Sequence, residues 1–164
     1  MSCYDSHVLD AMTRLGESGE PMNAIKVQVQ FEPDSKNLYA EIMIDDQLLV
    51  SLKRDELAID LVELAKTIKQ DGEFFIITCT CGNPGCAGIT TGVNVHRDNE
   101  TVHWQFKVRQ ADSKNVRAVS FAQKDYATAV QEGIAQFTEL LKQHRDAEIV
   151  PYLMREQIES LKAK

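Results

Sequence analysis

Residues 88–108 read GITTGVNVHRDNETVHWQFKV, and the alternation of apolar and polar side chains in this stretch decides the fold class. Period-two alternation is typical of a strand with one buried and one solvated face. Residues 97–100 supply a turn between two such strands, and the simplest register places Val95 opposite Val102. The apolar face of the predicted hairpin consists of Val93, Val95, Val102, Trp104, Phe106 and Val108, and the polar face of Asn94, His96, Thr101, His103 and Gln105. A one-residue slip would exchange the two faces, so the pattern fixes which side chains are buried.

A second run of alternating residues precedes this hairpin. Residues 25–31 and 38–44 alternate in the same way, and residues 32–37 and 45–46 are rich in turn-forming side chains. Residues 48–52 predict a third strand. We therefore expect an antiparallel meander in this part of the chain.

Helical periodicity appears in several further segments. We expect a short helix over residues 6–15, an amphipathic helix over residues 56–70 and a last helix from Pro151 to Leu161. Additional strands are predicted over residues 74–80 and 116–119.

A long helix is predicted behind a capping box formed by Ser120 and Gln123. Its apolar stripe consists of Tyr126, Val130, Ile134, Phe137 and Leu141, with His144 as a further candidate. Gly133 lies inside this helix at a cost of about 1 kcal/mol relative to Ala, which indicates close packing there.

Together these elements predict one α+β domain over residues 1–164, with an antiparallel sheet of about six or seven strands and helices packed on one face. In this interpretation residues 1–23 form a helix and a loop, residues 24–121 are mainly sheet with one helix, and residues 122–164 form the C-terminal helices.

Charge and hydropathy exclude several classes of protein. The chain has 164 residues, with 25 acidic and 18 basic side chains and a formal net charge of −7. Nucleic-acid binding requires clustered cations, and no Lys/Arg run exceeds two residues, so no nucleic-acid partner is expected. The longest unbroken apolar run, residues 74–77, is too short to span a membrane. The first residues lack the pattern of a signal peptide, so we expect the chain in the cytoplasm with reduced thiols.

Three of the four cysteines gather in CTCGNPGC, residues 79–86. Cys79 and Cys81 are two residues apart at a predicted strand end, so their sulfurs point to the same side. The glycines and proline that follow can turn the chain and return Cys86 to them. Because soft thiolates suit zinc, this cluster predicts a structural zinc clip.

The fourth ligand of such a clip is less evident. His96 lies at the far end of the next predicted strand, and His103 on the returning strand is a better candidate. The zinc site predicted from sequence therefore consists of Cys79, Cys81 and Cys86, with His103 as the candidate fourth ligand.

Two other interpretations of the cysteines stay open. Cys79 and Cys81 could be small buried hydrophobic side chains next to a tight turn, because free cysteine is often buried. Cys81 and Cys86 could also close a redox-active disulfide, although the sequence shows no cation or helix N-terminus placed to lower a thiol pKa.

The cysteine motif also carries a family resemblance. The segments GEFFIITCTCG at 72–82, CAGI at 86–89 and VHW at 102–104 resemble a set of uncharacterised bacterial proteins, in which a helix follows near a Phe and a Tyr. Phe121 and Tyr126 occupy those positions here. The resemblance covers about residues 55–141; it implies a bacterial domain and no particular chemistry.

Other side chains are weaker functional candidates. His96 and His103 share the polar face of the hairpin, where imidazoles can bind a metal together or simply be solvated. Trp104, at the centre of the apolar face, is more consistent with a core residue than with a stacking platform. No phosphate-binding glycine loop, zinc-protease motif or nucleophile elbow is present.

From these observations we expect a non-enzymatic binding or interaction protein, with an unidentified protein or small molecule as partner. A small thiol-dependent redox protein or enzyme that uses the same loop is the alternative. The sequence leaves self-association undecided.

Overall fold

The computed structural model describes residues 22–107 and 116–162, and its mixture of helices and mostly antiparallel strands confirms the α+β class. The strands are β1 (Ile25–Glu32), β2 (Asn37–Ile44), β3 (Gln47–Leu48), β4 (Leu57–Ile59), β5 (Gly72–Phe74), β6 (Ile77–Cys79), β7 (Val93–Asp98), β8 (Thr101–Lys107), β9 (Val116–Ala122) and β10 (Glu148–Val150). The helices are α2 (Leu52–Asp55), α3 (Leu61–Lys66), η1 (Pro84–Ala87), α4 (Gln123–Gln143), η2 (Tyr152–Met154) and α5 (Arg155–Lys162). The helix expected over residues 6–15 lies outside the described residues.

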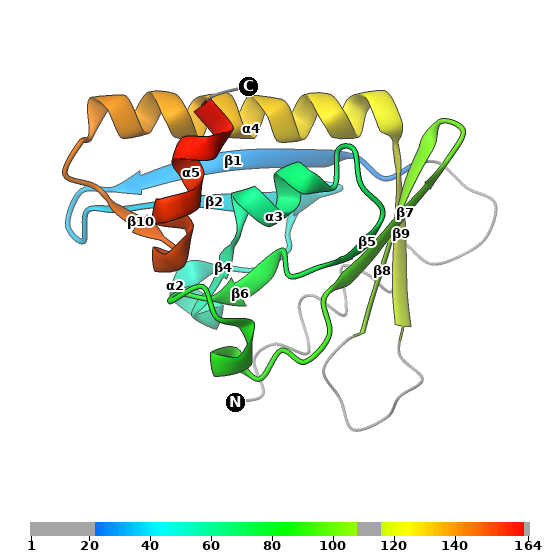
Figure 1. Cartoon of the computed structure of the whole chain (residues 1–164), viewed down its shortest axis with the longest axis horizontal. Coiled ribbons are helices and arrows are strands. Elements are labelled where there is room, and N and C mark those ends of the chain that lie inside the picture. The colour runs from blue at the N-terminus through cyan, green and yellow to red at the C-terminus, as the bar shows by residue number, and fades with distance from the viewer. Residues whose placement is uncertain (1–21, 108–115, 163–164) are drawn as a thin grey trace.

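The described strands form three sheets instead of the single sheet that we expected (Figure 1). The first has the order β1-β2-β10, with β3 also paired to β2; the second is the pair β4-β6; the third has the order β5-β7-β8-β9. All pairs are antiparallel except β10 with β2, which is parallel. The chain divides the expected strand at residues 74–80 between β5 and β6, and so between two sheets.

Helix α4 lies along β1 and β2 and covers one face of the first sheet (Figure 1). Its buried positions are Tyr126, Val130, Gly133 and Phe137, whereas Ile134, Leu141 and His144 of the predicted stripe are half-buried. Gly133 faces Val27 of β1, and a Cβ atom on Gly133 would lie 2.7 Å from the Val27 Cβ. The close packing predicted from this glycine is therefore confirmed.

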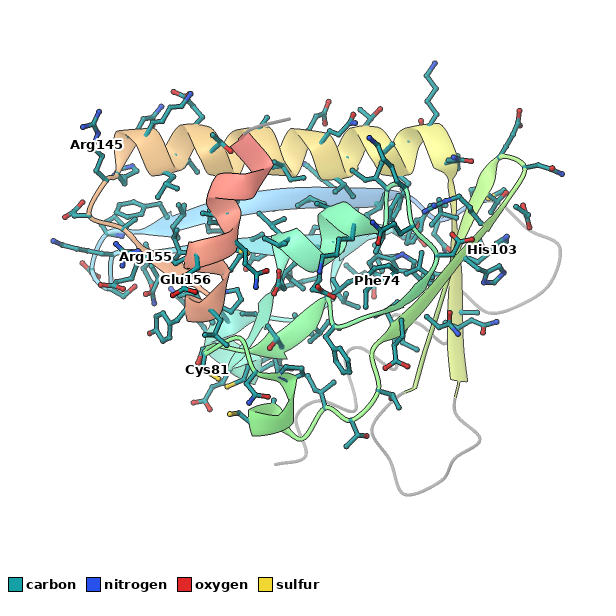
Figure 2. The ribbon with its side chains drawn as sticks, in the orientation of Figure 1. Phe74, Cys81, His103, Arg145, Arg155 and Glu156 are labelled. Atoms are coloured by element: carbon teal, nitrogen blue, oxygen red, sulfur yellow. The ribbon has the colours of Figure 1, made fainter. Side chains whose placement is uncertain are left out.

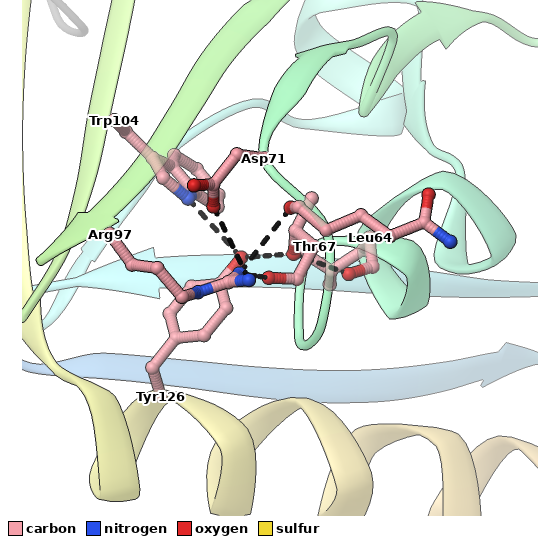
Figure 3. A network of polar contacts seen from close by, with 7 residues as sticks. Leu64, Thr67, Asp71, Arg97, Trp104 and Tyr126 are labelled. Carbon is pink, nitrogen blue, oxygen red and sulfur yellow. Dashed lines mark hydrogen bonds and ion pairs between the residues drawn. The ribbon is translucent and has the colours of Figure 1, made fainter.

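A buried polar chain joins the long helix to the other layers (Figure 3). Trp104 Nε1–H donates to the Tyr126 hydroxyl at 3.2 Å, and the Tyr126 and Thr67 hydroxyls are hydrogen-bonded. Thr67 donates to the Leu64 carbonyl, so it must accept from Tyr126. Several contacts act on the pKa of Tyr126, and burial has the largest effect. The pKa is raised to about 12, which keeps the phenol neutral.

The segment expected as one helix over residues 56–70 begins as a strand. Residues 57–59 form β4, which pairs with β6, and Asp60 then caps α3 by accepting from the Val62 and Glu63 amides. All three residues of β4 are buried, so the strand shows no alternation, and its apolar residues match a helical stripe by chance. The expected third strand is also shorter: it ends at Leu48, and Leu52 begins α2.

The hairpin has the predicted faces but a different register. Val95 pairs with Trp104 and His96 with His103, because the loop is shortened to Asn99 and Glu100 between the pair Asp98 and Thr101. A shift of two residues leaves every paired side chain on its expected face, and Val108 lies outside the described residues.

The prediction of a capping box at Ser120 and Gln123 was wrong. Ser120 belongs to β9, and Ala122 is the N-cap of α4 with no side-chain cap bond. At the C-terminal end, Pro151 precedes η2, and α5 starts only at Arg155.

The contact between α4 and β1 predicts the effect of Gly133→Ala. Helix propensity alone would favour alanine by about 1 kcal/mol, but the new methyl group would overlap the stiff, β-branched Val27. We expect the free energy of unfolding to fall by about 1–3 kcal/mol, measured by denaturant unfolding. Gln131→Ala, at an exposed position of the same helix, is the control. A Gly133→Ala protein more stable than the parent would contradict the packing described here.

Candidate functional site

The cysteine loop begins where β6 ends and is held by local hydrogen bonds. The Gly82 amide donates to the Cys79 carbonyl at 2.9 Å. Asn83 caps η1, its Oδ1 accepting from the Gly85 amide at 2.9 Å. Gly88 ends η1 in the left-handed region, with φ 69°. The turn predicted from Gly82, Pro84 and Gly85 is therefore present, and it returns Cys86 toward the strand end.

All three thiols of this loop are free, and they interact with one another. Cys79 and Cys81 are half-buried and Cys86 is exposed. The Asn83 amide donates to Cys81 Sγ at 3.3 Å. This backbone hydrogen bond, assisted by the Cys86 and Cys79 thiols, lowers the pKa of Cys81 below that of an ordinary thiol. Conversely, the hydrogen bond with Cys81 and the nearby Cys81 charge raise the pKa of Cys86.

This pair of shifts makes Cys81 the more readily ionised of the two thiols, Cys81 and Cys86. The sequence offered no cation or helix N-terminus to lower a thiol pKa, and the structure supplies a backbone amide and neighbouring thiols instead. Whether a backbone amide points toward a sulfur depends on the geometry of the turn, and residue spacing alone does not reveal that geometry.

The C-terminal segment packs on the same loop. The amides of Tyr152 and Leu153 donate to the carbonyls of Thr80 and Cys81, at 2.9 and 3.0 Å. Gly82 has φ 99°, and a Cβ there would lie 2.7 Å from the Leu153 Cβ. The Tyr152 and Leu153 side chains are 52% and 58% exposed. The thiols are therefore flanked by two apolar side chains that the fold leaves in solvent.

His103 lies elsewhere in the fold. It belongs to the third sheet, whereas the cysteines lie on β6 and η1, and Figure 2 shows Cys81 and His103 at different ends of the molecule. Its Nδ1 is hydrogen-bonded to Ser120 Oγ and its Nε2 to Asp98 Oδ2, each at 2.8 Å. The arrangement brings the three predicted cysteines together but does not bring His103 to them. His96 stacks on His103 with ring centroids 4.7 Å apart, so it lies on the same remote sheet.

Asp98, His103 and Ser120 have the connectivity of a catalytic triad, which sequence reasoning missed because Ser120 was interpreted as a helix cap. Two features argue for a structural role. The Asp98 side chain is 61% exposed, and the Ser120 amide, a natural oxyanion donor, already donates to Asn23 Oδ1 at 2.9 Å. These bonds tie β8 to β9 through Ser120 and to the end of β7 through Asp98.

Trp104 is completely buried and packs edge-on against Phe121 and Tyr126. Its position agrees with the core interpretation and leaves no surface for stacking a ligand.

The remaining observations on possible sites are absences among the described residues. Within residues 22–107 and 116–162, no group of three or more His, Cys, Asp or Glu side chains is arranged to hold a metal ion. In the same part of the chain no helix combines the length and apolarity needed to cross a bilayer. Comparisons with family models, curated proteins and solved structures gave no match.

The thiol pKa order predicts selective alkylation. At neutral pH we expect iodoacetamide to modify Cys81 faster than Cys86, since the thiolate is the nucleophile and Cys81 ionises at lower pH. Peptide mass spectrometry over a pH series would measure both rates. Cys86→Ala should shift the Cys81 profile to higher pH than Cys86→Ser, because serine keeps a hydrogen-bond donor. Equal rates at Cys81 and Cys86 would contradict the assignment.

Proposed function

We propose that this chain is a non-enzymatic interaction protein in which the loop of Cys79, Cys81 and Cys86 binds Zn²⁺ through its thiolates. The observation that carries the proposal is the placement of the three cysteines around one capped turn, where the Cys86 and Cys79 thiols help to lower the pKa of Cys81. Zinc binds thiolates and not thiols, so a loop that lowers the pKa of Cys81 lowers the cost of ionising that thiol when metal binds.

The turn geometry also supports metal binding. The Asn83 amide stabilises charge on Cys81 Sγ, and outer hydrogen bonds of this kind orient metal ligands and tune their basicity. Cys79 is anchored by β6, whereas Cys86 is exposed on η1 and is the thiol best able to adjust. We expect zinc to draw Cys86 toward the other two sulfurs.

The fourth coordination position is proposed to remain available to water or to a partner. His103 and His96 lie in another sheet, where both His103 ring nitrogens are hydrogen-bonded. Exposed Tyr152 and Leu153 border the loop and offer apolar contact to a bound protein. The proposed clip would therefore stabilise the loop and present this border as a contact surface.

A thiol redox role is the second candidate, and the lowered pKa of Cys81 beside exposed Cys86 favours it. In such a reaction the Cys81 thiolate would attack a substrate disulfide, forming a mixed disulfide and releasing one substrate thiolate. Cys86, once deprotonated, would attack the Cys81 sulfur, release the second substrate thiolate and leave a Cys81–Cys86 disulfide. The substrate gains the two electrons that the protein loses.

Zinc titration of the reduced full chain tests the leading proposal. We expect one Zn²⁺ per chain by native mass spectrometry with elemental analysis, and protection of Cys79, Cys81 and Cys86 from alkylation. Free zinc at 100 times its Kd should stabilise the fold by about 2.7 kcal/mol, seen as a higher melting temperature. Cys81→Ser should abolish both effects, and Cys3→Ser, which alters the cysteine outside the loop, should preserve them.

The two candidates give different results in this experiment. Zinc-free protein with an unchanged melting temperature and accessible thiols would reject the clip. Incubation with glutathione disulfide would then test the redox role, because rapid formation of a Cys81–Cys86 disulfide is expected only for that alternative.

A further inference from the structure

Strand β1 is an open edge of the first sheet. It contains eight residues and, among the described strands, pairs only with β2, in an unbroken register from Ile25↔Ile44 to Glu32↔Asn37. The Val29 amide turns away from β2 and donates to Gln136 Oε1 of α4 at 3.2 Å. Because backbone groups alternate along an antiparallel strand, the amides and carbonyls of Val27, Val29 and Phe31 all point outward.

Native edges are blunted by proline, bulges, short length, edge lysines or a covering helix. Strand β1 has no proline and no bulge in its register, and what protects it among the described residues is Lys26 near one end and Gln136 of α4, which accepts from the Val29 amide. A groove of about 530 Å³ runs beside it, lined by residues 25–30 together with Ala129, Glu132 and Gln136 of α4. Within residues 22–107 and 116–162, the edge is therefore long, regular and not paired with a further strand.

The sequence of β1 is complementary to itself in the antiparallel direction. Residues 26–32 read KVQVQFE, which is symmetric in character about Val29. Apolar Val27 and Phe31 flank the centre, Gln28 and Gln30 follow the same symmetry, and Lys26 at one end matches Glu32 at the other. Lys26 is exposed, and Glu32 binds Lys53 and Ser35 through different carboxylate oxygens.

From this pattern we propose that β1 is the dimer interface of the protein, pairing antiparallel with β1 of a second copy about a twofold axis at Val29. Val29 then faces the partner's Val29, Val27 faces the partner's Phe31, and Lys26 faces the partner's Glu32. All the facing backbone groups are the outward ones, so the ladder can form. The ion pair occurs twice by symmetry, as an isologous interface requires.

The alternative register is less favourable than the proposed one, and the existing contacts of β1 are compatible with the proposed register. A shift that sets Val27 against the partner's Val29 also satisfies the backbone, but it places Lys26 opposite Gln30 and leaves the charges unmatched. In the proposed register the Val29 amide exchanges Gln136 for the carbonyl of the partner's Val29, so no buried donor is lost. The inference rests on β1 and is independent of the thiol loop.

Sedimentation velocity of the full chain over a concentration series tests the proposal. We expect a reversible dimer, and Lys26→Glu or Glu32→Lys should each weaken it about tenfold by opposing like charges twice. The double variant K26E/E32K restores both pairs in reverse and should restore dimerisation. Lys69→Glu, an equal charge change at an exposed site away from β1, should have no effect. Thermal melting of each variant checks that the monomer fold survives.

Amide hydrogen exchange gives a second readout. The outward amides of Val27 and Phe31 should become protected as protein concentration rises, and Lys26→Glu should reduce that protection. A monomer at all concentrations, or a dimer indifferent to both single charge changes, would overturn the proposal. Protection that does not depend on concentration would also overturn it, because the edge would then be covered by something other than a second copy.

Discussion

The hydrogen-bond chain from Trp104 through Tyr126 and Thr67 to the Leu64 carbonyl is the constraint on which the layers of this protein depend. It joins β8, α4 and α3, which come from distant parts of the sequence. Every donor in the chain has one acceptor, so its direction is determined. A buried polar chain of this kind is stabilising only when complete, since each orphaned group costs about 1–3 kcal/mol. The requirement selects one relative placement of the three elements from the many that hydrophobic burial alone would permit.

The placement of α3 determines where the thiols lie. Strand β4 directly precedes α3 and forms the platform for β6, which ends at Cys79. From the other side, the Leu61 amide at the start of α3 donates to Met154 Sδ at 3.2 Å, which fixes the C-terminal segment against the same helix. That segment in turn binds the Thr80 and Cys81 carbonyls. The cysteine loop is thus held from both sides by the packing of one short helix.

Elements with strong periodicity were predictable from the sequence. The paired strands β1 and β2, the faces of the hairpin and the stripe of α4 all carry regular patterns longer than six residues. Short elements were not predictable: β4 and β10 have three residues each, too few to show a period, and β4 fits a helical stripe equally well. Ser120 was wrongly predicted as a helix cap because its spacing from Gln123 matches a capping box. In the structure it belongs to β9, and its hydroxyl is hydrogen-bonded to His103.

The candidate site was predictable only in part, for a related reason. The grouping of Cys79, Cys81 and Cys86 follows from local chain geometry, which glycine and proline positions reveal. The thiol ionisation order depends on one backbone amide, and the apolar border depends on a segment that joins the loop from about seventy residues away. Non-local contacts of this kind leave no spacing signal in a single sequence.

Stability alone does not explain two exposed features in the part of the chain that the structure describes. Tyr152 and Leu153 leave apolar surface in solvent next to the free thiols, although their backbone already secures the C-terminal segment. Strand β1 leaves outward amides along a regular edge, although a proline or a bulge would have closed it without disturbing the core face. Both features are liabilities in an isolated monomer, since exposed edges and apolar patches promote aggregation. Because the thiol loop lies at the end of β6 and β1 is the edge of another sheet, these features favour two separate contact surfaces, one formed by the thiol loop and the other by the strand.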